Sequence, residues 1–469
     1  MSGLPPSSAD ASADESANAS ADESAEAELD RRIAALAIPA LGAVAAEPLY
    51  NLADTAIVGH LGRTPLDALA IATTALMLAS WVAFFLSTAT TSAVAGLAAG
   101  RDPSRAARAA GAAYLVAAVG GAIVAALLAL AAPWLTQLLG ARGAVLGDST
   151  SYLRISAIGV PFLYLSYAGD GHLIGLANTR TPLRIAVGAN AVNVALEAAL
   201  VYGAHWGLRG SAWGTVIAQV TGAACYFAAS ERARIRLARP GGHEIGSLLR
   251  AGHQLSVRTI ALGVVPLTTT AIAARLGPVP LGGQQVAMRV WYLLSLLPDA
   301  LAVPAQVYVS SALGGAQAAA PADGAAPAGD GAAATDGARL VGRRSLRLGL
   351  IAGVVLAAAT AALAPFAPAA FTHDPAIRHA ATVALLVSSL TQPLAALAFV
   401  LDGLVLGISD YAAMRRAMIV AALAYAPVAA LVLRLHALGL PGIWVALGIW
   451  LAARAVLLGR RWARHVRQT

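Results

Sequence analysis

The chain has 469 residues, of which 58% are hydrophobic and 12% are charged, and its formal net charge is +8. Soluble domains carry about 25% charged residues, so this composition and a mean hydropathy of +0.69 exclude an ordinary soluble protein. All 32 basic residues are arginines. Without lysine the chain has no Walker A phosphate loop and no Schiff-base lysine, which excludes an ATP motor of that type.

Residues 1–30 are rich in Ala, Ser, Asp and Glu and lack the basic and apolar regions of a signal peptide. This composition predicts a disordered acidic cytoplasmic tail. The rest of the chain is predicted to contain an N-lobe, a basic cytoplasmic linker, a C-lobe interrupted by a flexible Gly/Ala/Pro/Asp loop, and a basic cytoplasmic tail. Their respective boundaries are 31–231, 232–250, 251–460 (with the loop at 314–338) and 461–469.

Apolar runs of 20 or more residues recur along the chain, and each is long enough to cross a bilayer as a helix. The sequence therefore predicts an all-α integral membrane protein with twelve transmembrane helices. The expected spans are 33–59, 66–95, 106–135, 150–176, 182–203, 208–230, 245–275, 281–312, 339–366, 377–406, 411–435 and 438–459.

The arginines follow a membrane topology rather than a nucleic-acid-binding pattern. With a cytoplasmic N-terminus, 23 arginines fall to the inner side, six to the outer side, and Arg154, Arg258 and Arg289 inside spans. This positive-inside bias places both termini in the cytoplasm. We expect a multi-pass protein of the cell (inner or plasma) membrane.

Three short motifs occur twice. Leu61-Gly62…Leu66 (LGxxPL) recurs 215 positions later, and Asp170-Gly171 and Gly207-Leu208 each recur 232 positions later. The offset is larger for the last two motifs because, in the second half, the 314–338 loop lies after the LGxxPL motif and before the other two. Each half has six spans, so the halves enter the membrane from the same side. The sequence thus predicts two parallel six-helix repeats around a central cleft.

Two acids, Asp54 and Glu197, have no counterpart in the second half, where Thr269 and Ala429 stand. Both acids lie roughly 8–10 Å below the outer ends of their predicted helices. Tyr152 and Thr215 lie at a similar depth, while Tyr50 and Asn193 each precede one acid by four residues and so share its helix face. The pattern fits a proton-binding or sodium-binding cavity, and it equally fits two acids that hydrogen-bond neighbouring helices.

The segment Glu47–Gly62 (EPLYNLADTAIVGHLG) resembles the first-helix signature of multidrug and toxin extrusion (MATE) transporters. Asn178-Thr179-Arg180-Thr181-Pro182 is similar to that family's DTRTP-like loop, and the stretch from Asp299 to Gly314 resembles its DNA-damage-inducible (DinF) branch. The resemblance covers about residues 31–460. It implies a cation or proton site in the N-lobe at Tyr50, Asp54, Tyr152, Asn193, Glu197 and Thr215, with Glu197 where Asp is frequent.

Four other acids lie within spans. Asp299, between Pro298 and Pro304, is a secondary candidate for a substrate or proton path in the C-lobe, with pairing to an arginine such as Arg289 as its alternative role. Asp170 and Asp402 recur with flanking glycines, which favours tight packing or a loop hydrogen bond. Glu47 precedes Pro48 and is a weaker candidate for the cleft.

The sequence is therefore interpreted as a secondary exporter that moves organic, often cationic and amphipathic compounds against protons or sodium. The alternatives are a lipid-linked precursor flippase of the same superfamily, a membrane enzyme, and a structural or regulatory membrane protein. An enzyme is disfavoured because the sequence has no recognisable nucleophile–base pair and no metal-binding motif. We expect no cofactor or metal beyond the coupling ion, no nucleic-acid partner, and a monomer in the lipid bilayer.

Overall fold

The computed structural model describes residues 8–319 and 328–468. These residues form α-helices joined by short turns, and no strand occurs among them. The first half contains α1 (Ser8–Gly59), α2 (Arg63–Ala83), α3 (Phe85–Ala99), α4 (Pro103–Leu138), α5 (Gly143–Ala157), α6 (Val160–Gly175), α7 (Arg180–Ala198), the π-helix η1 (Ala199–Gly203) and α8 (Leu208–Glu231). The second half contains α9 (Gly242–Leu276), α10 (Pro278–Ala319), α11 (Ala328–Leu363), the 3₁₀ helix η2 (Ala367–Ala370), α12 (Pro375–Gly407), α13 (Tyr411–Arg434), the 3₁₀ helix η3 (His436–Leu438) and α14 (Gly439–Gln468).

Ten helical segments of the described chain are long and apolar enough to cross a membrane. They coincide with ten of the twelve predicted spans. Of the other two, the predicted span 150–176 is divided between α5 and α6, because the helix is interrupted at Ile158–Gly159. The predicted span 208–230 corresponds to α8, which falls outside these ten segments. The molecule is thus an all-helical membrane protein.

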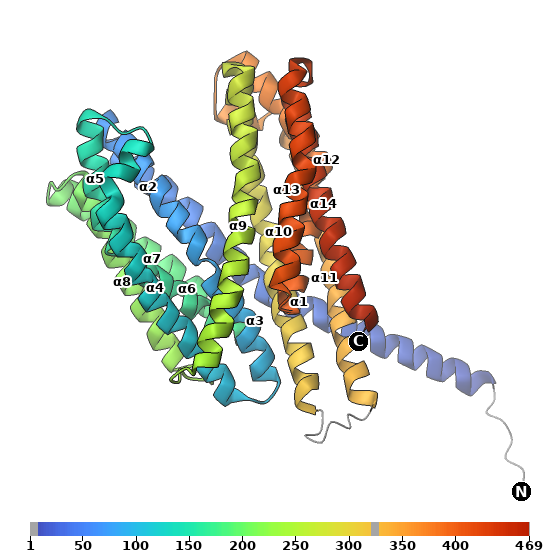
Figure 1. Ribbon diagram of the computed structural model, residues 1–469. Helices are drawn as coiled ribbons and strands as arrows, with labels where there is room; N and C mark the ends of the chain where they lie inside the picture. Colours follow the sequence, from blue (N-terminus) through green and yellow to red (C-terminus); the bar gives the residue numbers. More distant parts are fainter. Residues whose placement is uncertain (1–7, 320–327, 469) are drawn as a thin grey trace, which may run out of the picture.

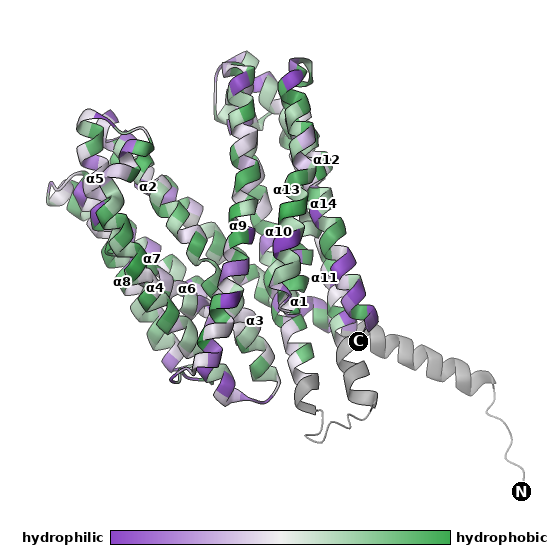
Figure 2. Cartoon of the chain, viewed as in Figure 1, coloured by the Kyte–Doolittle hydropathy of each residue, from purple (hydrophilic) through white to green (hydrophobic). Residues whose placement is uncertain are grey.

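The helices gather into two bundles (Figure 1). In the N-lobe, α6 packs against α3, α4 and α8, and α7 packs against α1 and α8. In the C-lobe, α12 is central and contacts α10, α11 and α14, while α13 packs between α9 and α14. Figure 2 shows that hydrophobic residues predominate along the helices, as expected of helices that cross a membrane.

The duplicated motifs adopt the same local structure in both halves. Gly62 and its counterpart Gly277 have φ angles of 115° and 121°, in the region that glycine favours. A Cβ at Gly171 would lie 2.4 Å from the Ser87 carbonyl oxygen, and one at Gly403 would lie 2.3 Å from the carbonyl oxygen of Ala302. The glycines of the Asp-Gly motif therefore let α6 approach α3, and α12 approach α10, in the same way.

The lobes touch at one end, where α3 meets α10 and α12, and diverge toward the end that carries α5 (Figure 1). Gln306 of α10 donates hydrogen bonds from Nε2 to the Thr88 carbonyl oxygen (2.7 Å) and to Ser92 Oγ (2.8 Å). Ser92 in turn donates to the Leu406 carbonyl oxygen at 2.9 Å. These side chains are buried, so the contact is a closed seam between the lobes. We call it the inner seam, because it lies at the end of the molecule for which the sequence predicts a cytoplasmic position.

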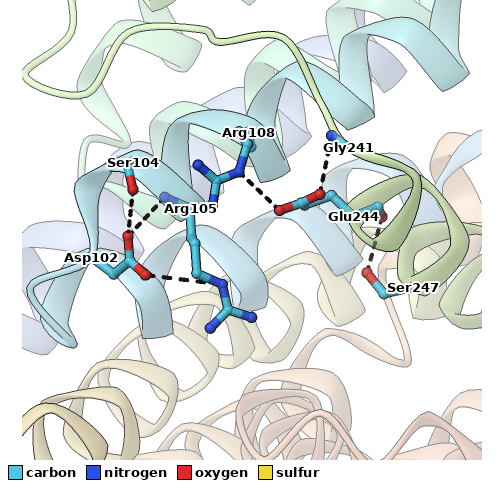
Figure 3. Close-up of polar contacts among 7 residues, drawn as sticks. All are labelled: Asp102, Ser104, Arg105, Arg108, Gly241, Glu244 and Ser247. Atoms are coloured by element: carbon cyan, nitrogen blue, oxygen red, sulfur yellow. Dashed lines mark hydrogen bonds and ion pairs between the residues drawn. The ribbon is translucent and has the colours of Figure 1, made fainter.

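A second link joins the lobes on the same side, between α4 and α9 (Figure 3). Arg108 Nε lies 3.0 Å from Glu244 Oε1, and the other Glu244 oxygen accepts the Gly241 backbone N–H at 3.1 Å. At the start of α4, Asp102 caps the helix by accepting the Arg105 backbone N–H at 2.9 Å. That hydrogen bond, together with one from Ser104, lowers the pKa of the Asp102 carboxyl below its ordinary value.

The structure corrects two predictions about irregular segments. Residues 8–30, predicted to be a disordered tail, belong to α1, because alanine and glutamate have high helix propensity. Within the predicted loop 314–338, helix continues to Ala319 and resumes at Ala328, and residues 320–327 lie outside the described part of the chain. Of the other predicted boundaries, 231/232 coincides with the end of α8, whereas 250/251 lies within α9 and 460/461 lies within α14.

Candidate functional site

The six residues predicted to form the N-lobe site lie together in the structure. Tyr50 and Asp54 share one face of α1, and the Tyr50 hydroxyl lies 3.1 Å from Thr215 Oγ1 on α8. Tyr50 also lies beside Glu197 and Asn193 of α7, and Tyr152 of α5 lies beside Asp54. Four different parts of the N-lobe therefore contribute side chains to one cluster. We call this group, with Ser211, the N-lobe cluster.

Both carboxyl groups of this cluster are removed from solvent. Asp54 is 5% exposed and Glu197 is fully buried. Asp54 Oδ1 accepts a hydrogen bond from Ser211 Oγ at 3.0 Å. Glu197 lies beside Asp54 and Ser211, yet no well-oriented hydrogen bond reaches either of its carboxyl oxygens within the described residues. The site thus has oxygen ligands available for a proton or a small cation.

Sequence reasoning did not find Ser211. It lies four residues before Thr215, so the two hydroxyls occupy one face of α8. Gly210 and Gly214 flank these hydroxyls and bring α7 close: a Cβ on Gly214 would lie 3.1 Å from the Glu197 backbone nitrogen, and one on Gly210 would lie 2.8 Å from the Leu200 carbonyl carbon. The alternation of glycines and hydroxyl residues in α8 therefore positions Glu197 next to Asp54.

The π-helical turn η1 begins two residues after Glu197. Such turns are rare and occur mostly at functional sites. Within it, Tyr202 donates a hydrogen bond to the Ile57 carbonyl oxygen of α1 at 2.7 Å. This bond joins η1 to α1 three residues beyond Asp54.

The repeated acids have different surroundings in the two lobes. Asp170 accepts a hydrogen bond from Ser87 Oγ at 2.7 Å, in keeping with the tight packing that its motif predicts. Its counterpart Asp402 instead accepts from Arg258 Nη2 at 2.8 Å and Arg454 Nη2 at 2.7 Å. Besides the tight packing at Gly403 that its motif predicts, Asp402 thus belongs to a buried ion triad that joins α9, α12 and α14.

Asp299 lies next to this triad and interacts with all three of its members. The predicted alternative partner, Arg289, is exposed and forms no ion pair with it among the described residues. Arg454, which the sequence assigned to the inner side, is 1% exposed, and its guanidinium carbon lies 4.7 Å from the ring centre of Trp450. The side chain of Glu47 lies outside the described part of the structure.

Comparison with known proteins defines the class. The MatE family model matches residues 39–198 and 330–431, more than half of the chain. The chain therefore belongs to the MATE family of membrane transporters, which are not enzymes. A solved multidrug resistance MATE family transporter of the MOP superfamily in an outward-facing conformation superposes with a TM-score of 0.84 and 19% identity, covering 94% of this chain and 97% of that one. This likeness establishes the fold.

Among individual relatives, the chain is 30% identical to "Protein DETOXIFICATION 44, chloroplastic" of Arabidopsis thaliana, over 90% of this chain and 80% of that protein. It is 26% identical to "DNA damage-inducible protein F" of Escherichia coli, over 92% of both chains. The match to "Protein DETOXIFICATION 43" of Arabidopsis thaliana, at 31% identity, covers 66% of this chain but only 56% of that relative. The chain is thus a homologue of DinF and of plant DETOXIFICATION proteins.

Proposed function

We propose that the chain exports amphipathic organic compounds, often cationic, in exchange for protons or sodium ions that bind the N-lobe cluster. The observation that carries this proposal is the convergence of two buried carboxyls with hydroxyl, phenol and amide groups. Ionisable residues at membrane depth are costly and generally mark ion pathways. The family membership and the name of a relative, "Probable multidrug resistance protein NorM" of Thermotoga maritima, support the substrate class.

In this proposal twelve helices cross the membrane as two parallel repeats. The α5–α6 pair and α8 supply the eleventh and twelfth spans in addition to the ten apolar segments. The matching close contacts at Gly171 and Gly403 support the duplication. The lobes enclose a central pathway that is closed at the inner seam. Ion binding shifts the conformational balance only through a difference in affinity between the outward-open and inward-open states.

Dye efflux from proteoliposomes tests this function. An imposed proton or sodium gradient is expected to accelerate efflux of an amphipathic cationic dye relative to liposomes without protein. Efflux that is the same with and without either gradient would contradict the proposal. The flippase alternative receives less support, because Arg258 and Arg454 both form ion pairs with Asp402, and Asp299 beside them balances the second positive charge, which leaves no buried cationic cavity in that part of the described structure.

The topology gives a separate prediction. We expect both termini and the segment around Ala325, which lies outside the described residues, to face the cytoplasm because of the arginine bias. In a Cys225→Ala background, an impermeant thiol reagent should label Ala204→Cys, exposed in an outer turn, but not Ala325→Cys in intact cells. Labelling of Ala325→Cys from outside would refute this orientation.

The inner seam gives a prediction about conformation. A Cβ on Gly314 would lie 1.9 Å from the Gly96 carbonyl oxygen, whereas one on Gly315 would meet no atom closer than 4.0 Å. Gly314→Ala should therefore separate α3 from α10 and favour the inward-open state, and Gly315→Ala should not. In a Ser92→Cys, Cys225→Ala background, thiol labelling from the inner side should be faster with Gly314→Ala. Equal rates in the two alanine variants would argue against the seam as the inner gate.

A further inference from the structure

A groove between α13 and α14 combines arginines with apolar residues at the end of the molecule that holds the inner seam. Its volume is about 460 Å³. The residues that line it are Asp410, Ala413, Arg416, Ala417, Val420, Leu457, Arg461, Arg464 and Gln468. The N-lobe cluster and the C-lobe ion triad contribute none of these residues. The groove is therefore separate from the groups that the transport proposal uses.

The charges lining the groove do not cancel. It contains three arginines and one aspartate, which gives a formal charge of +2 (3 − 1). Asp410 is already engaged, because it forms an ion pair with Arg461 Nε and accepts the Ala413 backbone N–H at 2.9 Å. Among the described residues, neither Arg416 nor Arg464 forms an ion pair, and both side chains are exposed. Two cationic heads are thus available to an anion at the groove.

The surface that continues from the groove toward the membrane centre is apolar. On α13, Val420 and Leu423 follow Arg416 by four and seven residues, so all three share one face. Val420 is 48% exposed and Leu423 is 66% exposed. Leu423 lies roughly 10 Å along the helix from Arg416. Hydrophilic residues gather at the C-terminal end of α14, and hydrophobic residues predominate along the rest of that helix (Figure 2).

We propose that this groove binds an acidic phospholipid. Its phosphate would lie between Arg416 and Arg464, with an acyl chain along Val420 and Leu423. Basic pockets between transmembrane helices on the cytoplasmic side suit anionic headgroups, because that leaflet carries anionic lipid. A free phosphate shares the headgroup chemistry but gains nothing from the apolar stripe. The proposal depends on the arginine-rich end facing the cytoplasm and does not depend on the transported compound.

The test uses the purified full-length chain in a neutral detergent, with thermal unfolding as the readout. Dioleoyl-phosphatidylglycerol should raise the unfolding temperature saturably, whereas dioleoyl-phosphatidylcholine and inorganic phosphate should change it little. Arg416→Gln/Arg464→Gln should raise the half-saturating phosphatidylglycerol concentration by roughly 10–30-fold. Both side chains are exposed, so folding should be retained, and the single variant Arg464→Gln should give an intermediate shift.

The matched control is Arg415→Gln/Arg460→Gln. It removes the same number of charges, from Arg415, which precedes Arg416, and from Arg460, which lies one helical turn before Arg464; neither residue lines the groove. This control should change the half-saturating concentration by less than about twofold, because neither guanidinium lines the groove that would hold the phosphate. Equal losses in the two double variants would overturn the groove in favour of general electrostatic attraction. A response to inorganic phosphate as large as that to phosphatidylglycerol would overturn the lipid in favour of a free anion.

Discussion

Replacement of Asp402 with asparagine is expected to reduce the free energy of unfolding by about 3–5 kcal/mol, the usual cost of removing one partner from a buried ion pair. Asparagine keeps the shape but removes the carboxylate with which both arginines form ion pairs, so only Asp299 beside them remains to balance two cationic side chains. Arg258 is 8% exposed and Arg454 is 1% exposed, so water cannot replace the carboxylate. The variant should accumulate at lower levels in the membrane and unfold at a lower temperature in detergent.

The matched control is Asp170→Asn, at the repeated position in the N-lobe. Asp170 accepts a hydrogen bond from Ser87, and an asparagine oxygen can accept the same bond. Its loss of stability should stay near the value of one hydrogen bond, about 0.5–1.5 kcal/mol. If the two variants lose the same free energy of unfolding, the ion pairs of Asp402 contribute less to stability than their 2.7–2.8 Å distances indicate.

The fold could be predicted from sequence because hydrophobic length and turn glycines are local signals. Gly62 and Gly277, which the repeated motif singled out, both have positive φ and mark equivalent turns. The break between α5 and α6 was missed because the apolar run continues across it, although Gly159 and Pro161 at the start of α6 were available signals. Alanine and acidic residues in residues 8–30 suit both a helix and a disordered tail, and composition alone does not distinguish them.

The N-lobe cluster was predictable because depth and i,i+4 spacing are set by helix geometry. Ser211 was missed because a serine in an apolar helix is a frequent packing residue, although its spacing from Thr215 was an available signal. Arg454 was missed for a different reason. An arginine near the inner end of a helix normally extends toward water, and only tertiary packing shows that this one points into the C-lobe toward Asp402.

The duplicated scaffold therefore carries different charges in its two copies. The positions in the N-lobe that match Arg258 and Arg454 are Ala43 and Gly222, so Asp170 has no cationic partner there. Conversely, the C-lobe has Thr269 and Ala429 where the N-lobe has its two carboxyls. In the C-lobe the triad compensates its aspartate internally, whereas the N-lobe cluster retains acids without an arginine. This asymmetry favours the N-lobe as the place where a cation from solution is bound.

Asp54→Asn and Glu197→Gln are each expected to abolish gradient-driven efflux while the protein still inserts and folds. Both changes keep shape and remove the titratable charge, and neither leaves a buried arginine unpaired. Without the titratable group no ion is exchanged for the compound, so the efflux rate under an imposed gradient should fall to the rate measured without one. Proteoliposome efflux under imposed proton and sodium gradients measures it, with Asp299→Asn as the C-lobe comparison. If Glu197→Gln retains the wild-type rate and the same pH and sodium dependence while Asp54→Asn fails, Asp54 alone carries the ion. If both retain them, the coupling site lies elsewhere, and Asp299 becomes the leading candidate.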